Sequence, residues 1–133
     1  MAVVSTESVP IRSEPDVVTV RRRVREVSAQ LGLSLVDQTK IVTAASELAR
    51  NTIIYGGGGS MQVQTLNGPR VGLRLTFEDH GPGIPDIDLA LRDGFTTGSG
   101  LGLGLGGSKR LVNEFEIVSR LGEGTRITIT RWK

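Results

Sequence analysis

The sequence predicts an α/β protein of the α+β kind, a two-layer sandwich in which helices cover one face of a mixed, mostly antiparallel sheet. Apolar residues recur every three or four positions in some segments and at alternate positions in others, which indicates helices and strands, respectively. Asn67-Gly68 lies between two alternating segments, and this dipeptide favours a tight hairpin. The 133 residues are expected to form one domain, residues 1–133.

The first half of the chain is expected to contain an edge strand and two helices. Residues 9–12 read as a short strand, which Pro10 confines to a sheet edge. Residues 13–31 have a serine N-cap followed by apolar residues at helical spacing, and they predict the first helix. Residues 34–53 predict the second helix, again with a serine cap, and the four glycines at 56–59 end it.

The second half is expected to supply the rest of the sheet and two more helices. Alternating apolar residues predict an antiparallel pair of strands, followed by a short helix, a polar glycine-rich loop, a third long helix and two last strands. In chain order these segments are residues 61–66, 71–77, 86–92, 93–100, 103–115, 116–120 and 125–132.

The composition narrows the classes of function. The chain has no cysteine, which excludes disulfides and thiolate metal sites and favours the reducing cytoplasm. We expect no membrane association, because no apolar run approaches the roughly 20 residues of a membrane span. The net charge is +2, yet no aromatic residue interleaves with the arginines at 21–25, so we expect no nucleic-acid partner. Those arginines instead form a solvated helix face or a docking surface for an acidic protein.

Two glycine-rich segments indicate a nucleotide site. Asp79 follows an apolar strand and precedes Gly81 and Gly83, and a second glycine cluster occupies residues 98–107. Backbone N–H groups without a neighbouring Cβ can approach phosphates closely, while the acid is free to bind a base. The alternative for the first segment is a tight turn that needs no ligand.

Other phosphate motifs do not fit the second cluster. A Walker loop is excluded because Ser108, not glycine, precedes Lys109. A dinucleotide-binding fingerprint is excluded because a loop, not a strand, precedes Gly100.

Glu47 and Asn51 lie four residues apart and therefore share one face of the second helix. The amide oxygen of Asn51 can bind a magnesium ion that also holds phosphates, and Glu47 can accept the proton of an attacking hydroxyl. By itself this pair is equally typical of any exposed helix surface.

Three segments together resemble a known superfamily. Glu47-Leu-Ala-Arg-Asn51, Asp79-His-Gly81-Pro-Gly83 and Gly100-Leu-Gly102-Leu-Gly104 resemble the N box and the two glycine boxes of the ATPases and kinases that include gyrase, the 90-kilodalton heat-shock chaperone, histidine kinases and the mismatch-repair ATPase. Thr125 resembles the threonine that assists adenine binding in that superfamily. Residues 45–51, 78–86 and 93–97 are similar to the bacterial stressosome switch kinases, within the anti-sigma-factor kinase family, and this similarity extends along almost the whole chain.

The resemblance implies the Bergerat ATP-binding fold and a serine/threonine protein kinase that uses ATP and Mg²⁺. The implied partners are STAS-domain substrates and a PP2C-type phosphatase that the free kinase activates. Glu47 is implied to be the general base and Asn51 the magnesium ligand. The residues implied to bind ATP are Asp79, Gly81, Gly83, Gly100, Gly102, Leu103, Gly104, Lys109 and Thr125, with a solvated charge as the alternative for Lys109.

Within this resemblance, Asp79 accepts a hydrogen bond from the adenine amino group and the first glycine box leaves room beside the base. The backbone around residues 102–104 holds the phosphates, and residues 86–99 act as a lid. The sequence departs from the family pattern at Ser99, where glycine is common, and at residues 106–108, where a proline is expected nearby. His80 is expected to be an exposed turn residue rather than a phosphoacceptor.

Two other functions stay open. The protein could be an anti-sigma factor that sequesters a sigma factor, or an adaptor that binds ATP without transferring phosphate. A homodimer is possible through pairing of the edge strand at residues 9–12.

Overall fold

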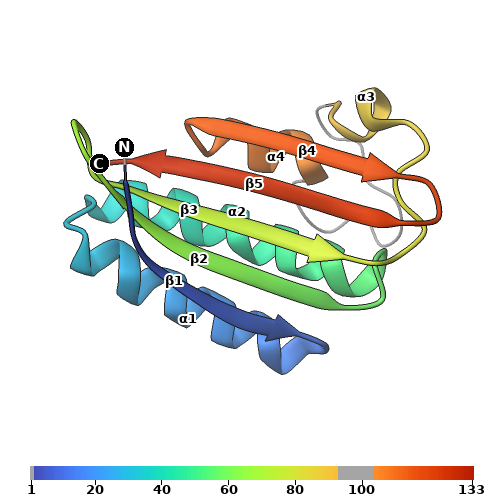
Figure 1. Cartoon of the computed structure of the whole chain (residues 1–133), viewed down its shortest axis with the longest axis horizontal. Helices are drawn as coiled ribbons and strands as arrows, with labels where there is room; N and C mark the ends of the chain where they lie inside the picture. Colours follow the sequence, from blue (N-terminus) through green and yellow to red (C-terminus); the bar gives the residue numbers. More distant parts are fainter. Residues whose placement is uncertain (1, 93–103) are drawn as a thin grey trace.

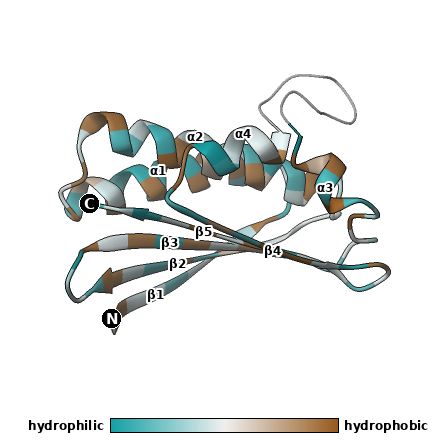
Figure 2. Ribbon diagram, turned by 90° about the horizontal axis from the view of Figure 1, so that it is seen from above, coloured by the Kyte–Doolittle hydropathy of each residue, from teal (hydrophilic) through white to brown (hydrophobic). Residues whose placement is uncertain are grey.

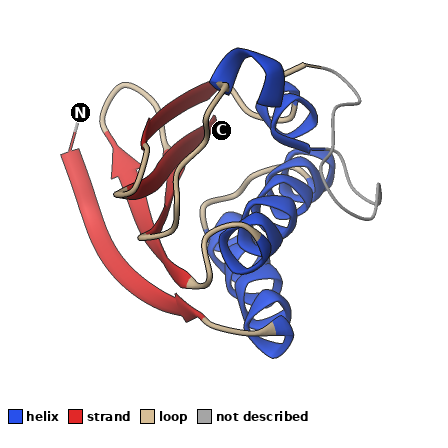
Figure 3. Ribbon diagram, turned by 90° about the vertical axis from the view of Figure 1, so that its right-hand side faces the viewer, coloured by secondary structure: helices blue, strands red, loops and turns tan. Residues whose placement is uncertain are grey.

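The computed structural model describes residues 2–92 and 104–133. Figure 2 shows two layers, with the helices on one face of a single sheet, and Figure 3 shows the same arrangement end-on. This is the predicted α+β sandwich. The elements are β1 (Ala2–Ile11), α1 (Glu14–Gln30), α2 (Leu35–Ile54), β2 (Gly59–Asn67), β3 (Gly72–Asp79), α3 (Ile87–Ala90), α4 (Gly104–Arg110), β4 (Glu114–Arg120) and β5 (Gly124–Trp132).

The five strands are ordered β1-β2-β3-β5-β4, as Figure 1 shows. Each of the four neighbouring pairs is antiparallel, so the described sheet has no parallel pair. The expected hairpin joins β2 to β3 around Asn67-Gly68. β3 is the central strand, and its last residue lies at the right-hand end of Figure 1, where β5 begins.

Both long helices begin at the predicted serine caps. At the start of α1, the Asp16 carboxylate accepts hydrogen bonds from the backbone N–H groups of Arg12 at 2.7 Å and Ser13 at 3.3 Å. At the start of α2, the Ser34 hydroxyl accepts a hydrogen bond from the Asp37 N–H at 3.1 Å. The contacts at Ser13 and Asp37 each give a partner to a backbone donor that the start of a helix leaves unpaired.

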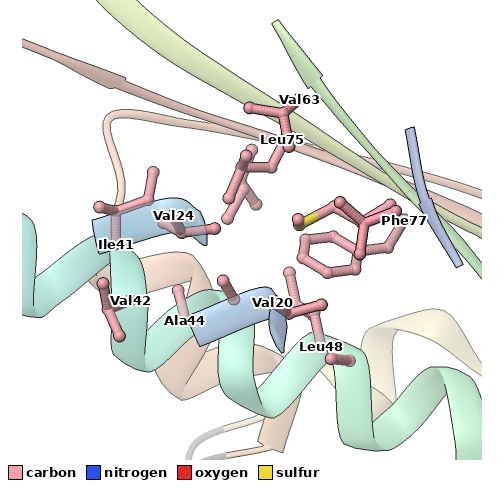
Figure 4. Close-up of a cluster of buried hydrophobic side chains, with 14 of the residues drawn as sticks. Val20, Val24, Ile41, Val42, Ala44, Leu48, Val63, Leu75 and Phe77 are labelled. Atoms are coloured by element: carbon pink, nitrogen blue, oxygen red, sulfur yellow. The ribbon is translucent and has the colours of Figure 1, made fainter. Parts of the chain in front are cut away.

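The core lies between the helices and the inner face of the sheet. Figure 4 shows Val20 and Val24 of α1 and Leu48 of α2 beside Leu75 and Phe77 of β3. All five side chains are at most 2% exposed. Burying a side chain of this size stabilises the fold by about 1.5–3 kcal/mol. Because side chains alternate across a strand, the inward position that follows Phe77 is residue 79.

Ion pairs join the helix layer to the sheet. The Arg23 guanidinium of α1 contacts the Glu7 carboxylate of β1 at 2.8 Å, and Arg131 of β5 contacts Asp37 of α2 at 2.6 Å. In each pair the hydrogen bond from the arginine lowers the pKa of the carboxyl group below its ordinary value.

Two predicted boundaries are wrong by five residues or more, and others differ by one or two. β1 begins at Ala2 instead of residue 9, because it pairs with β2 along nearly its whole length, with a bulge between Val3 and Ser5. The third long helix ends at Arg110 instead of residue 115. The reason lies at Asn113, whose N–H donates to the Thr130 carbonyl at 2.9 Å, so the chain already pairs with β5 there.

The face of the sheet without helices carries an open groove, lined mostly by polar side chains of β2, β3, β4 and β5. None of the predicted site residues that the structure describes lines this groove. In residues 2–92 and 104–133, no helix combines the length and the apolar character that a membrane crossing requires.

Candidate nucleotide-binding site

Asp79 lies at the end of β3, on the inward side that the alternation from Phe77 predicts. It is half-buried, and its Oδ1 accepts a hydrogen bond from the Gly81 N–H at 2.9 Å. Within the described part of the chain, Oδ2 accepts no hydrogen bond. The carboxylate is therefore held in place by one oxygen and can accept a hydrogen bond from a ligand with the other.

Gly56, just after α2, makes room for this carboxylate. A Cβ on Gly56 would overlap the Asp79 carboxyl group, and a Cβ on Gly81 would lie 2.7 Å from the Gly56 Cα. The end of α2 and the first glycine box thus touch backbone to backbone, which only glycine permits. The sequence analysis assigned Gly56 to the helix stop alone. The available signal was the length of the glycine run, since a helix stop needs one glycine rather than four.

Gly83 fixes the first glycine box against the turn between β4 and β5. Its φ of +81° favours glycine, and a Cβ there would lie 2.5 Å from the Arg120 carbonyl oxygen. The Pro82 carbonyl accepts a hydrogen bond from the Gly122 N–H at 2.9 Å. The first glycine box is therefore positioned by the turn between β4 and β5 as well as by α2.

Thr125 begins the inward face of β5 and is paired with Asp79 across the two strands. Its side chain is buried, and its Oγ1 lies 2.9 Å from the Oγ of Ser119 in β4. The Ser119 hydroxyl also accepts a hydrogen bond from the Ile84 N–H at 2.7 Å. The sequence analysis did not select Ser119. The sequence feature that could have identified Ser119 is a serine at an inward strand position, where the alternation predicts an apolar residue.

Glu47 lies in the middle of α2 and is only 8% exposed. Its Oε1 accepts a hydrogen bond from the Gly104 N–H at 3.1 Å, so the start of α4 meets the carboxylate from 57 residues away in the sequence. Asn51 lies one turn further along α2 and is half-buried. The structure thus brings the N box to the end of the second glycine box.

The remaining predicted residues divide into two groups. Lys109 is exposed and lies in the last turn of α4, at the opposite end of this helix from Gly104. Gly100, Gly102 and Leu103 lie outside the described residues, as does the second half of the expected lid, residues 93–99.

The donors and acceptors present fit a nucleotide carrying magnesium. Asp79 offers an acceptor oxygen to an amino group. In residues 2–92 and 104–133 there is no cluster of three or more histidine, cysteine or acidic side chains that could hold a metal alone. Magnesium does not need such a cluster, because it is commonly bound by one or two protein oxygens together with substrate phosphates. Asn51 can supply one such oxygen.

The chain is similar to known ATPases and kinases. Residues 36–133 match the family model of the histidine kinase-, DNA gyrase B- and HSP90-like ATPases. The chain is 47% identical over 125 residues to the serine/threonine-protein kinase RsbT of Bacillus subtilis, covering 93% of this chain and 94% of that protein. It is also 32% identical to an anti-sigma F factor of a Thermoanaerobacter species, over 84% and 82% of the two chains.

Solved structures show the same fold. The RsbU and RsbW domains of a Mycobacterium tuberculosis protein superpose with a TM-score of 0.67 at 24% identity, over 97% of this chain and 33% of that chain. The mycobacterial sensor histidine kinase MprB superposes with a TM-score of 0.56 at 20% identity, over 96% and 97% of the two chains.

These similarities confirm the predicted resemblance and the predicted enzyme class, a protein serine/threonine kinase. They also confirm the use of ATP by this kind of domain. The chain belongs to the family of histidine kinase-, DNA gyrase B- and HSP90-like ATPases.

Proposed function

We propose that the protein is a magnesium-dependent kinase that transfers phosphate from ATP to serine or threonine in STAS-domain proteins and works as a partner-switching regulator in the cytoplasm. When released from its substrate, it activates a PP2C-type phosphatase. The single observation that carries the proposal is the contact between the Glu47 carboxylate and the Gly104 N–H, which joins the N box to the second glycine box. The similarity to RsbT supports the substrate class.

In this proposal the base is bound at the end of the central strand. The free oxygen of Asp79 accepts a hydrogen bond from the adenine amino group, and the neighbouring Thr125 hydroxyl contacts the same edge of the ring. Gly81 and Gly83 let the first glycine box pack directly on the backbone of Gly56 and Arg120, which holds the base-binding end of β3 in place. Gly100, Gly102 and Leu103 hold the phosphates through their backbone N–H groups, while Gly104 ends the box and its own N–H donates to Glu47. Asn51 binds the magnesium ion. Lys109 is exposed and serves as a solvated charge.

Glu47 acts as the general base. The bound nucleotide supplies a γ-phosphoryl group whose charge the magnesium ion offsets. The substrate hydroxyl oxygen forms a bond to the γ-phosphorus while the bond from that phosphorus to the bridging oxygen breaks, and ADP leaves. Glu47 receives the hydroxyl proton. Its role is mainly to orient the hydroxyl, because phosphoryl transfer depends on positioning more than on covalent participation by the protein.

The test is to incubate the protein with γ-labelled ATP, magnesium and purified STAS-domain proteins from the same genome. We expect label to enter one STAS protein, and mapping of the phosphosite to find a serine or threonine. Activation of a PP2C-type phosphatase by the kinase, and its loss when unphosphorylated STAS protein is added, tests partner switching. Absence of label from every STAS protein would overturn the substrate assignment.

The second candidate function is that of an anti-sigma factor, favoured by the 32% identity to an anti-sigma F factor. It predicts that the protein retains a sigma factor in a pull-down with purified sigma, STAS and PP2C proteins. An adaptor without catalysis predicts tight ATP binding and no transfer to any partner. Size-exclusion chromatography with light scattering tests for a homodimer.

A further inference from the structure

Ser119 shares one row of the sheet with the two residues assigned to the base. The register pairs Asp79 with Thr125 and Thr125 with Ser119, on the adjacent strands β3, β5 and β4. All three side chains lie on the side that faces the helices. This follows from alternation, because the residues two positions away in each strand belong to the core or pack against it, namely Phe77, Ile127 and Ile117.

The hydrogen bond between Ser119 and Thr125 can run in either direction, because each hydroxyl has one proton to donate and two lone pairs that accept. The Ser119 oxygen already accepts the Ile84 N–H at 2.7 Å, and a hydroxyl has one proton to donate. Two acceptors are within reach of that proton, the Thr125 Oγ1 at 2.9 Å and the Gly124 carbonyl oxygen at 3.4 Å. The contact with Thr125 is the shorter and falls in the usual range for hydroxyl donors, which favours donation from Ser119 to Thr125 over donation to Gly124.

This direction fixes what Thr125 can offer to a ligand. With its oxygen accepting from Ser119, Thr125 keeps its own proton for donation. Beside it, Asp79 can only accept when ionised. Adenine presents an amino donor next to a ring-nitrogen acceptor, whereas guanine presents a carbonyl acceptor next to an N–H donor at the same edge. The acceptor and donor at residues 79 and 125 are therefore complementary to adenine and mismatched to guanine.

We propose that Ser119 is a positioning residue that fixes Thr125 as a hydrogen-bond donor and thereby sets the preference of the site for adenine over guanine nucleotides. Ser119 acts through Thr125 and does not touch the base. Without its hydroxyl, Thr125 can rotate and offer a lone pair instead of a proton, which removes part of the mismatch with guanine. The inference rests on the proposed ATP site.

The experiment measures the affinities of the full chain for ATP and for GTP by calorimetry in the presence of magnesium. We expect Ser119→Ala to reduce the ratio of ATP to GTP affinity about tenfold, the effect of one lost hydrogen bond at the upper end of its range. Ser119→Thr keeps the hydroxyl on a residue suited to strands and should restore the ratio. The double variant with Thr125→Val should have the same ratio as Thr125→Val alone, because both changes remove one interaction.

Thr76→Ala is the matched control, because it removes one hydroxyl of the Thr76–Thr128 pair on the face without helices. It should leave the ratio unchanged. If Ser119→Ala weakens ATP and GTP binding equally, Ser119 is only structural and the proposal is wrong. The proposal would also be contradicted if the two substitutions in the double variant reduced the ratio of ATP to GTP affinity independently, each by its own factor. If Ser119→Ala does not fold, Ser119→Cys, whose thiol is a weak donor, should reduce the same ratio. Absence of ATP binding by the wild-type protein would instead overturn the proposed function.

Discussion

The two halves of the site are built in different ways. The base half consists of Asp79, Thr125 and Ser119, which neighbouring strands of one sheet place in a single row. The transfer half consists of Glu47 and Asn51 on α2 together with Gly104 at the start of α4. Here one hydrogen bond of 3.1 Å joins residues 57 positions apart in the sequence. Where one face of a sheet is buried, the strand register determines which side chains lie next to each other. No such register relates α2 to α4.

Because of this difference, we expect the two halves to control different quantities, the affinity for ATP and the rate of phosphate transfer. The base half is held before any ligand arrives, by short contacts at Gly81, Ile84 and Gly122. We therefore expect changes there to alter mainly the affinity for ATP. Changes in the transfer half should alter mainly the rate of phosphate transfer, because Glu47 interacts with the attacking hydroxyl only as the reaction proceeds.

Glu47→Gln should give the largest effect on activity. Glutamine keeps an oxygen that can accept the Gly104 N–H, but it cannot take up a proton at neutral pH. We expect kcat to fall by about 10²–10⁴-fold, the usual contribution of a general base, with ATP affinity within about twofold of wild type. Labelled phosphate transfer to the STAS protein measures kcat, and calorimetry measures ATP binding.

Glu26→Gln, on the exposed side of α1, is the control for the loss of one carboxylate and should leave both values unchanged. A Glu47→Gln protein that transfers phosphate at the wild-type rate would remove Glu47 from the role of base. An equal loss of ATP affinity and rate would place Glu47 in binding instead.

Asp79→Asn should give the next largest effect, and it should act on affinity. The asparagine oxygen is expected to keep the hydrogen bond from the Gly81 N–H, which turns the amide NH₂ toward the ligand. Two donors then face each other where adenine offers its amino group. We expect the Kd for ATP to rise about 30-fold, as for the loss of a hydrogen bond to a charged group.

Calorimetry measures this Kd, and transfer at saturating ATP should stay within a fewfold of wild type. Asp88→Asn, on the exposed side of α3, is the matched control for the loss of charge. A Kd for Asp79→Asn equal to that of wild type would mean that the base binds elsewhere.

Gly56→Ala tests whether the contact between α2 and the base half matters. The added Cβ overlaps the Asp79 carboxyl group, so that side chain or the glycine box must shift. We expect ATP affinity to fall about tenfold and stability to fall by about 1–3 kcal/mol, as for other overpacking substitutions. Calorimetry and urea unfolding measure the two effects.

Gly57→Ala is the control for backbone strain. Gly57 has a φ of +73°, but a Cβ there would meet no atom within 4 Å. Gly57→Ala should therefore lower the free energy of unfolding by about 1–2 kcal/mol without changing ATP affinity. Equal ATP affinities for the two variants would mean that the space beside Asp79 does not control binding.

The sequence predicted those parts of the fold and site that depend on local pattern. The serine caps, the hairpin at Asn67-Gly68 and the position of Asp79 at the end of a strand each follow from residues close together in the chain, and the structure has all three. Glu47 and Asn51 could be selected because helical spacing alone places them on one face.

The sequence did not predict contacts between distant segments. Ser119 and Gly56 belong to the site through strand register and backbone packing, and neither property is visible in the residues around them. The length of β1 was also missed, because Ala2 to Ser8 pairs with β2 across a long connection and lacks a continuous alternation of its own. Residue 115 was placed in a helix because the apolar spacing there fits both kinds of element.

Asp37→Asn should give the smallest effect, at the end of the molecule opposite the site. Asp37 lies at the start of α2 and its partner Arg131 near the end of β5, whereas Thr125 begins that strand. The arginine lowers the pKa of Asp37 below its usual 3.8, so the pair stabilises the folded state at pH values above 3.8. We expect Asp37→Asn to lower the free energy of unfolding by about 1 kcal/mol at pH 7, with ATP affinity unchanged.

The pH dependence distinguishes this charge effect from a loss of packing. A lowered pKa in the folded protein means that the stabilisation is complete well above pH 3.8 and disappears as the pH falls through that value and then through the folded pKa. Urea unfolding of both proteins should therefore give a constant difference between pH 7 and 5 and a smaller one at pH 3.5. A difference that does not change with pH would assign the loss to packing. A loss of ATP affinity would instead show that the two ends of the molecule are coupled, and would contradict the separation of the site from this ion pair.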